Sequence, residues 1–272
     1  MEVYRRLANR ERKTENKIIL QKISKQENNH YNILKEKTGE DVDFSKIRVY
    51  LHVIISIFLG LTFSLKLMEK TEQNAAREYR DLGYENIAKE EDEHEKELLS
   101  LLEEDGLNYL SSIILGLSDA LVELTGALAG LTFAFQELRI VALAGLVTGI
   151  SASFSMAASE FLATKEENSN RSPIKAALYT GTAYIITVFL LVIPYLLLSD
   201  SSEIIWGLEP HIQALIITFI IGLLIIALFN LYVSIAQDKS FNRRFFEMVF
   251  ILLIVTLISF LIGVILRESF GL

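Results

Sequence analysis

Hydrophobic residues are concentrated in the second part of the chain, in five long runs with almost no charged side chain. Each run has roughly 20 or more residues, and an α-helix of that length, at about 1.5 Å per residue, matches the hydrocarbon thickness of a bilayer. We therefore predict an all-α integral membrane protein. Its five spans are expected at about 108–134, 138–163, 174–198, 211–234 and 245–266.

The first 106 residues follow a different pattern, in which charged and apolar positions recur at helical spacing. A bundle of four helices is expected there, at about 1–15, 17–37, 46–80 and 84–104. Gly39 is a plausible stop for the second helix. The chain thus divides into a helical domain at 1–106 and a membrane domain at 107–272.

Segment 49–65 is apolar enough to resemble a sixth span. It is short for a crossing, and a crossing there would place the helices before and after it on opposite sides of the bilayer. We interpret the segment as part of the third bundle helix, either buried in the bundle or lying on the membrane surface. His52 within it is expected to be a packed side chain and not a ligand.

Charge adds an orientation and excludes several functions. Lys and Arg occur in the loops after the second and fourth runs but not after the third, so the positive-inside rule places the bundle in the cytoplasm and suggests the cell membrane. The net charge of −8 argues against a nucleic-acid partner and suits cations. The absence of cysteine means that any metal must bind carboxylate, imidazole or thioether groups.

Two E-x-x-H sequences, Glu27 to His30 and Glu91 to His94, lie in the bundle. In di-iron bundles, a Glu and a His three positions apart on one helix point to the same metal site, and two such helices are joined by a Glu from each of two others. Two similar motifs in one domain indicate a duplicated helical hairpin that holds a metal pair. The alternative is a bundle whose acidic residues are simply solvated.

The remaining carboxylates of such a site would come from the other two helices. The third helix is expected to supply Glu72 or, one turn earlier, Glu69. The first helix offers Glu2 ahead of Tyr4.

Ionisable residues inside a span are costly in lipid and are therefore candidates for function. Asp119 and Glu123 lie four apart, on one face of the first span, and Met156 and Glu160 repeat this spacing in the second. Carboxylates with a thioether suit a borderline divalent cation. The alternative is that Glu160 snorkels to the membrane boundary and that Met156 packs in the core.

Small residues give the first span a smooth face. Gly126 and Gly130 are spaced for close approach at a subunit or helix interface. The last two runs are nearly pure Leu, Ile, Phe and Val, so we expect them to face lipid.

Two segments of the membrane domain carry a family resemblance. GLSDALVELTGALAGLTFA and GLVTGISASFSMAASEFLATK resemble the first two spans of the vacuolar iron transporter family, and the likeness covers 107–272. The first 106 residues resemble a rubrerythrin-like ferritin domain. The combination is similar to the membrane-bound ferritin proteins.

This resemblance implies a five-span homodimer that carries Fe²⁺, and often Mn²⁺, between its subunits in exchange for protons. Asp119 takes the place of the family's first-span aspartate and Met156 that of its second-span methionine. Thr148 stands where plant and fungal members have a pathway glutamate, so Glu160 or Glu123 is expected to supply that charge.

We thus expect an exporter of cytosolic iron with a pathway through Asp119, Glu123, Met156 and Glu160, and a bundle that collects Fe²⁺, in a site that could hold two irons. The rival hypothesis is a membrane-anchored di-iron oxidase or peroxidase, in which the bundle is a ferroxidase. A third hypothesis is a metal sensor that gates the transporter.

Overall fold

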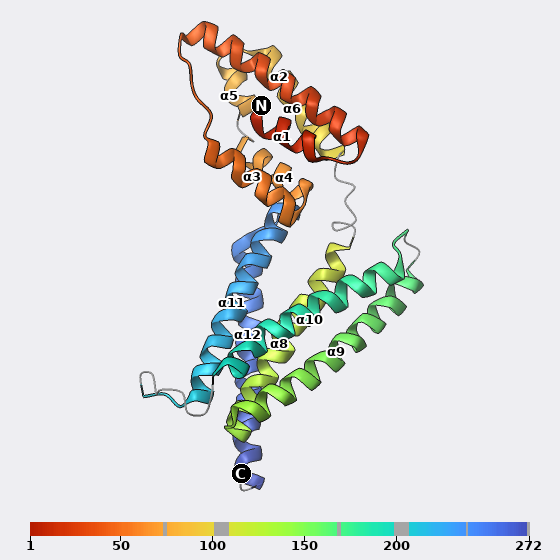
Figure 1. Cartoon of the computed structure of the whole chain (residues 1–272), viewed down its shortest axis with the longest axis vertical. Coiled ribbons are helices and arrows are strands. Elements are labelled where there is room, and N and C mark those ends of the chain that lie inside the picture. The colour runs from red at the N-terminus through yellow and green to blue at the C-terminus, as the bar shows by residue number, and fades with distance from the viewer. Residues whose placement is uncertain (73–74, 101–108, 168–169, 199–206, 238, 271–272) are drawn as a thin grey trace. The chain divides into compact units, whose positions relative to one another are not determined.

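The computed structural model describes the chain except residues 73–74, 101–108, 168–169, 199–206, 238 and 271–272. The side chains at 58–59, 62, 69–72, 75–76, 95 and 99–100 also lie outside the description. The regular elements of the described part are helices, which confirms the all-α fold (Figure 1). Contacts divide the chain into two compact units, the first mainly Met1–Leu107 and the second Asn108–Ser234 with Ser240–Leu272.

The described part of the first unit forms six helices: α1 (Glu2–Arg10), α2 (Thr14–Thr38), α3 (Lys46–Leu59), α4 (Leu61–Glu72), α5 (Ala75–Asp81) and α6 (Glu85–Ser100). Helix α2 ends where expected, because Gly39 adopts a left-handed conformation with φ of 73°. Its N–H donates to the carbonyl of Lys35 at 2.9 Å, which caps the helix.

The expectation of one continuous helix over 46–80 is wrong. Gly60 separates α3 from α4 with φ of 91° and ψ of 157°, a conformation that favours glycine. Helix α4 then folds back on α3, since the hydroxyl of Ser64 donates to the carbonyl of His52 at 3.0 Å. Helix α5 follows as a further separate element.

A small apolar core holds the first unit together. Its buried side chains come from α1, α2, α4 and α6: Tyr4, Leu7, Ala8, Leu20, Ile23, Leu65, Met68 and Leu98. Because Leu20 and Ile23 of α2 share this core with Leu98 of α6, the two helices with E-x-x-H motifs lie together.

The second unit contains the five predicted spans: α8 (Leu110–Phe135), α9 (Leu138–Glu166), α10 (Pro173–Leu197), α11 (Pro210–Gln237) and α12 (Phe241–Phe270). All five are long and apolar enough to cross a bilayer, so the number of spans is confirmed for the described residues. Helices α8 and α9 are joined by a tight turn in which Gln136 adopts φ of 55°, and they pack antiparallel.

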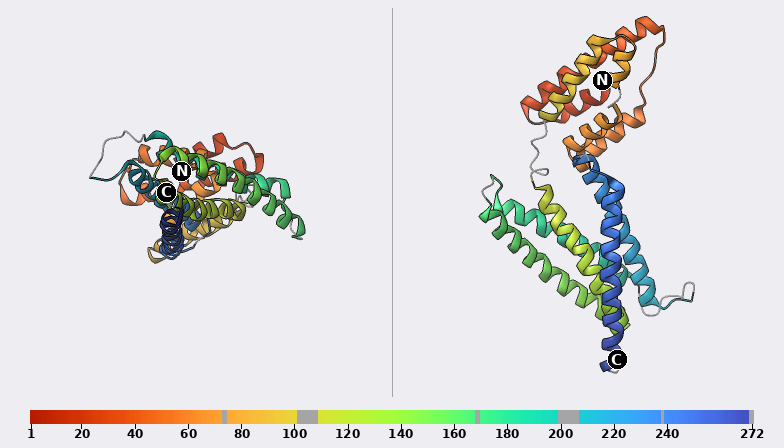
Figure 2. Two further views of the ribbon diagram at one scale, coloured as in Figure 1. Left: turned by 90° about the horizontal axis from the view of Figure 1, so that it is seen from below. Right: turned by 180° about the vertical axis from the view of Figure 1, so that it is seen from behind.

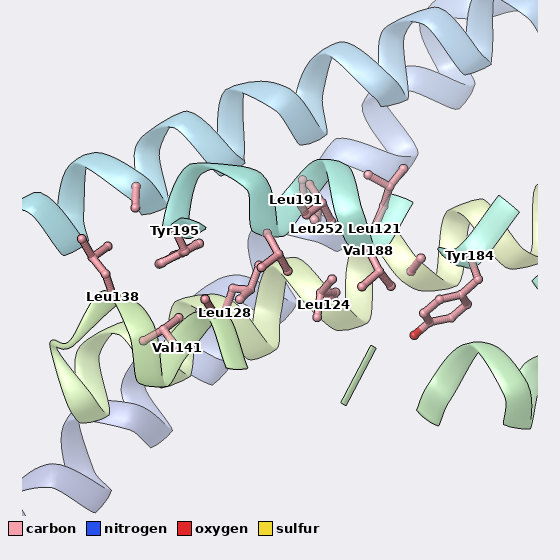
Figure 3. Packing of buried hydrophobic residues seen from close by; sticks show 14 of the residues in the cluster. Leu121, Leu124, Leu128, Leu138, Val141, Tyr184, Val188, Leu191, Tyr195 and Leu252 are labelled. Carbon is pink, nitrogen blue, oxygen red and sulfur yellow. The ribbon is translucent and has the colours of Figure 1, made fainter. Parts of the chain in front are cut away.

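Helix α8 is the centre of this unit and packs against α9, α10 and α12 (Figures 1 and 2). The core is drawn in Figure 3, where Leu121, Leu124 and Leu128 of α8 meet side chains of neighbouring helices. Among those neighbours are Val141 of α9 and Val188 of α10.

The glycine face of α8 packs against α12 within the same chain. A Cβ added to Gly263 would lie 2.3 Å from the carbonyl oxygen of Gly130, and one added to Gly126 would lie 2.9 Å from a methyl of Val255. Most of α12 is exposed, as expected for a lipid-facing helix. Its small residues nevertheless form a contact with α8 that the apolar composition of α12 did not predict.

Candidate functional site

Helices α2 and α6 bring the two E-x-x-H motifs face to face. Ligand atoms of Glu27, Glu91 and His94 lie within 4.8 Å of one another. The ring centroids of His30 and His94 are 5.8 Å apart. The structure therefore gathers these four predicted ligands into one cluster.

Glu91 lies between the two histidines. Its Oε1 is 3.2 Å from Nδ1 of His30 and its Oε2 is 3.4 Å from Nδ1 of His94. Glu27 contributes an oxygen 3.6 Å from the same Nδ1 of His94. Glu91 thus contacts both histidines, and Glu27 contacts the histidine of the other helix.

The Nε2 atom of each histidine ring contacts a further polar side chain. Nε2 of His30 donates to Oε2 of Glu90 at 2.7 Å, and Nε2 of His94 lies 3.2 Å from Oε1 of Gln26. Such outer hydrogen bonds fix the tautomer and ring orientation of a histidine that binds metal through its other nitrogen. Gln26 and Glu90 were absent from the sequence prediction, although each stands directly before the Glu of a motif.

The surroundings of the two histidine Nδ1 atoms fit a metal site. The Nδ1 atoms of His30 and His94 are both buried and have no well-aligned hydrogen bond within the described structure, although carboxylate oxygens lie 3.2 to 3.6 Å away. A buried polar atom without a partner is costly, and here both atoms face carboxylate oxygens. Two imidazoles with two carboxylates are a donor set that suits Fe²⁺ or Mn²⁺.

Without metal, the same groups form a network of opposite charges. Burial opposes the charged form of His94, but hydrogen bonds and charge from Glu27 and Glu91 raise its pKa to about 9. Burial likewise opposes the charge on Glu91, yet the two histidines lower its pKa to about 2. The pKa of His30 is also raised, first by its hydrogen bond to Glu91. Protons therefore take the place of a cation in the metal-free cluster.

The other two helices were expected to supply Glu2 and either Glu69 or Glu72, and only Glu2 has a described side chain. Glu69 and Glu72 belong to α4, but their side chains lie outside the described residues, so their role stays a prediction. Glu2 is buried and paired with Arg5 at 2.6 Å and Arg6 at 2.8 Å. Burial raises the pKa of Glu2, and the two arginines more than offset this, so the pKa is lowered overall.

A cavity of about 680 Å³ lies beside the cluster. Glu2, Glu27, His30, Asp43 and Tyr79 are among its lining residues. Part of the cluster of Glu27, His30, Glu91 and His94 is therefore accessible from an open, partly acidic space. His52, by contrast, is half-buried, and burial lowers its pKa, as expected for a packed histidine.

In the second unit, Glu123 is held by a buried tyrosine. The hydroxyl of Tyr184 on α10 donates to Oε2 of Glu123 at 2.7 Å, and Tyr184 is fully buried. Asp119 lies one turn away on the same face of α8 and is partly buried. The two predicted carboxylates of the first span are thus neighbours at the contact of α8 with α10.

Glu160 is buried between α8 and α9. It is 9% exposed, and the buried hydroxyl of Ser112 donates to its Oε1 at 2.6 Å. This hydrogen bond joins α8 to α9 and argues against the snorkelling alternative. Met156 is partly buried against the apolar core, which fits the alternative that it is a packing residue.

The register of α8 and α9 places these residues at successive heights. Ser112 is opposite Glu160, and Leu128 is opposite Gly145. Since the helices are antiparallel, Met156 lies between the levels of Ser112 and Asp119. At about 1.5 Å per residue, the polar positions from Ser112 to Glu123 span about 16 Å, so they form a series of steps and not a single coordination shell.

Thr148, on α9, lines a groove between α8, α9 and α12. The groove has a volume of about 490 Å³ and an apolar wall formed by α8, α9 and α12. Gly126, Gly130, Ser259 and Gly263 also line it. Thr148 therefore presents a neutral hydroxyl to this groove.

Comparisons with curated proteins and with solved structures return no match. The family model described as the VIT family matches residues 110–171 and 166–264, which together cover the five spans and more than half of the chain. The match includes Asp119, Glu123, Met156 and Glu160. The chain belongs to the VIT family, the vacuolar iron transporter family of membrane metal-ion transporters.

Proposed function

We propose that this protein carries Fe²⁺, with Mn²⁺ as a second substrate, out of the cytosol in exchange for protons. The observation that carries the proposal is the series of carboxylates on α8 and α9, Glu160, Asp119 and Glu123, in a membrane domain of the VIT family. An ionisable side chain within a span is costly unless it serves a pathway or has a partner. We further propose that the protein acts as a homodimer in the cell membrane with its first unit in the cytoplasm.

The order of polar groups along α8 suggests the order of transport. The ion would pass Glu160 and Met156, then Asp119, then Glu123, before release on the far side. Exchange of the cation for protons keeps this series close to neutral, because an uncompensated charge in a low-dielectric interior is costly. Tyr184 would orient Glu123 for this step through its 2.7 Å hydrogen bond.

The first unit would collect the metal. Glu27, His30, Glu91 and His94 supply two carboxylates and two imidazoles, and Glu72 or Glu69 would complete the set from α4. The raised pKa of His94, about 9, means that metal must displace a proton there, which favours reversible binding over permanent storage.

The same cluster favours one alternative function, a membrane-anchored di-iron oxidase or peroxidase. Two histidines 5.8 Å apart that share Glu91 suit a pair of metal ions. The hydrogen-bonded carboxylates in the spans favour transport, because an anchor has no use for them. Oxygen consumption on addition of Fe²⁺, without flux, would favour the oxidase.

The test is Fe²⁺ flux into sealed proteoliposomes under an imposed pH gradient, with the full chain. Asp119→Asn removes one negative charge with little change of shape and is expected to abolish flux. Glu137→Gln is the matched control, because Glu137 is exposed at the start of α9 and lies outside the series. Normal flux in folded Asp119→Asn would contradict the pathway.

A second pair of variants tests the role of the first unit. Glu91→Gln and His94→Gln are expected to reduce flux at low Fe²⁺ concentration and to leave the flux at saturating Fe²⁺ unchanged. Unchanged flux at every concentration would show that transport does not depend on the cluster.

A further inference from the structure

Helix α3 carries an exposed apolar stripe. Ile47 is 82% exposed, and four other apolar side chains are 50% to 53% exposed: Tyr50, Leu51, Ile54 and Ile57. At about 100° per residue these five lie within an arc of about 120°. Val49 and Val53, on the other side of α3, are buried in the first unit. The stripe is therefore a surface and not part of the core.

Isolated apolar residues on a surface are ordinary, but a continuous stripe on one helix face marks a contact. A crossing of the bilayer is excluded as that contact, because the 14 residues of α3 extend only about 21 Å and the helix stops at Gly60. A helix of this length with one apolar face fits the plane of a membrane surface.

The charge around the stripe suits an anionic surface. Lys46 and Arg48 begin α3, and the helix has no acidic residue. Of the three acids just before it, Glu40 is exposed, Asp41 is paired with Lys35 at 2.6 Å, and Asp43 lines the cavity beside His30 together with Arg48. Helix α6, in contrast, has seven acidic residues and two lysines. Helix α3 itself thus carries only basic charge, with Lys46 beside the stripe.

The short connection between α6 and the first span limits how far the first unit can lie from a membrane. Helix α6 ends at Ser100 and the first span begins at Leu110. Nine intervening residues extend to at most about 35 Å, which is about the diameter of a small domain. The first unit therefore experiences a high local concentration of lipid surface whatever its orientation.

We propose that α3 is a membrane-surface helix, with its apolar stripe in the boundary between headgroups and acyl chains and with Lys46, at the edge of the stripe, against anionic phosphates. This contact confines the first unit to the bilayer surface. It does not depend on which ion the second unit carries.

The absence of cysteine allows a direct test with the full chain in nanodiscs of mixed phosphatidylcholine and phosphatidylglycerol. Ile54→Cys is labelled with an environment-sensitive fluorophore on the stripe. Glu36→Cys, exposed on α2, is the matched control. The label at 54 is expected to be quenched several-fold more by phospholipid with a shallow spin label than by aqueous iodide. The label at 36 is expected to show the reverse.

Two outcomes would overturn the proposal. One is a label at 54 that iodide quenches as readily as the label at 36. The other is a label at 54 shielded from both quenchers but self-quenched between chains, which would assign the stripe to a second copy. Lys46→Gln is expected to weaken lipid quenching at 54, and unchanged quenching would remove Lys46 from the contact.

Discussion

Nε2 of His30 donates a 2.7 Å hydrogen bond to Glu90, and this bond turns Nδ1 of the same ring toward Glu91. Glu90 stands next to Glu91, a proposed metal ligand, but its carboxylate contacts the histidine of the other helix. Gln26 has the corresponding place beside His94. Each motif is therefore one residue longer than E-x-x-H. A Gln or Glu precedes it, and the side chain of that residue contacts the histidine of the other helix.

Glu90→Ala is expected to weaken Mn²⁺ or anaerobic Fe²⁺ binding by about 10-fold to 100-fold, because it removes the partner that orients His30. Glu90→Gln should recover part of this loss, since the amide oxygen still accepts the hydrogen bond. Glu93→Gln, on the exposed side of α6, serves as the control. Equal affinity in all three would show that Glu90 has no orienting role.

Metal binding should release protons at neutral pH. Because the pKa of His94 is raised to about 9, the ring is protonated at pH 7 and must lose that proton to offer Nδ1. Apparent affinity is therefore expected to rise with pH and to level off near pH 9. Titration calorimetry in two buffers of different ionisation enthalpy measures the released protons. A pH-independent affinity between pH 6 and 8 would contradict the protonated state of His94.

The metal-free first unit should show a related dependence of stability on pH. A raised histidine pKa stabilises the fold below the ordinary value of 6.5, and this is lost as pH rises through about 9. The lowered pKa of Glu91 stabilises it above the ordinary value of 4.5, and this is lost as pH falls toward about 2. In thermal unfolding of the metal-free protein, the contribution of this cluster to stability should be greatest near pH 5 to 6. His94→Gln should remove the decrease in stability that the loss of its charge causes as pH rises toward 9.

Gly263→Ala tests the contact between α8 and α12. A Cβ at this position would lie 2.3 Å from the carbonyl oxygen of Gly130, so the two helices must separate. We expect a destabilisation of about 1–3 kcal/mol in detergent and a loss of flux. Gly222→Ala is the matched control, because its Cβ would meet its nearest neighbours at an ordinary 3.8 Å. Equal thermal stability of both variants would contradict the close packing.

Glu160→Gln separates a transport role from a structural one. The variant can keep the hydrogen bond from Ser112 but loses the charge, so we expect normal folding with reduced metal flux. Ser112→Ala keeps the charge and removes the donor, and should cost about 1–3 kcal/mol of stability. Normal flux in Glu160→Gln would leave Glu160 as a structural residue.

The sequence by itself determined the elements that depend on composition and spacing. Five spans follow from apolar runs as long as a bilayer is thick, and the end of α2 follows from Gly39. The i, i+3 spacing places Glu27 with His30, and Glu91 with His94, on one side of each helix. These features are local, because the helical repeat and the bilayer act on short stretches of chain.

Only the tertiary structure decided which of these faces meet. The break at Gly60 accompanies the packing of α4 back on α3. The pairing of α8 with α12 through Gly130 and Gly263, and the partner of Glu160, depend on helices more distant in sequence. Gln26 and Glu90 escaped sequence analysis for the same reason: each looks like a solvated polar residue until a histidine of the opposite helix lies within hydrogen-bond distance. Helical periodicity assigns a residue to a face of its own helix, but the packing of several helices decides what that face contacts.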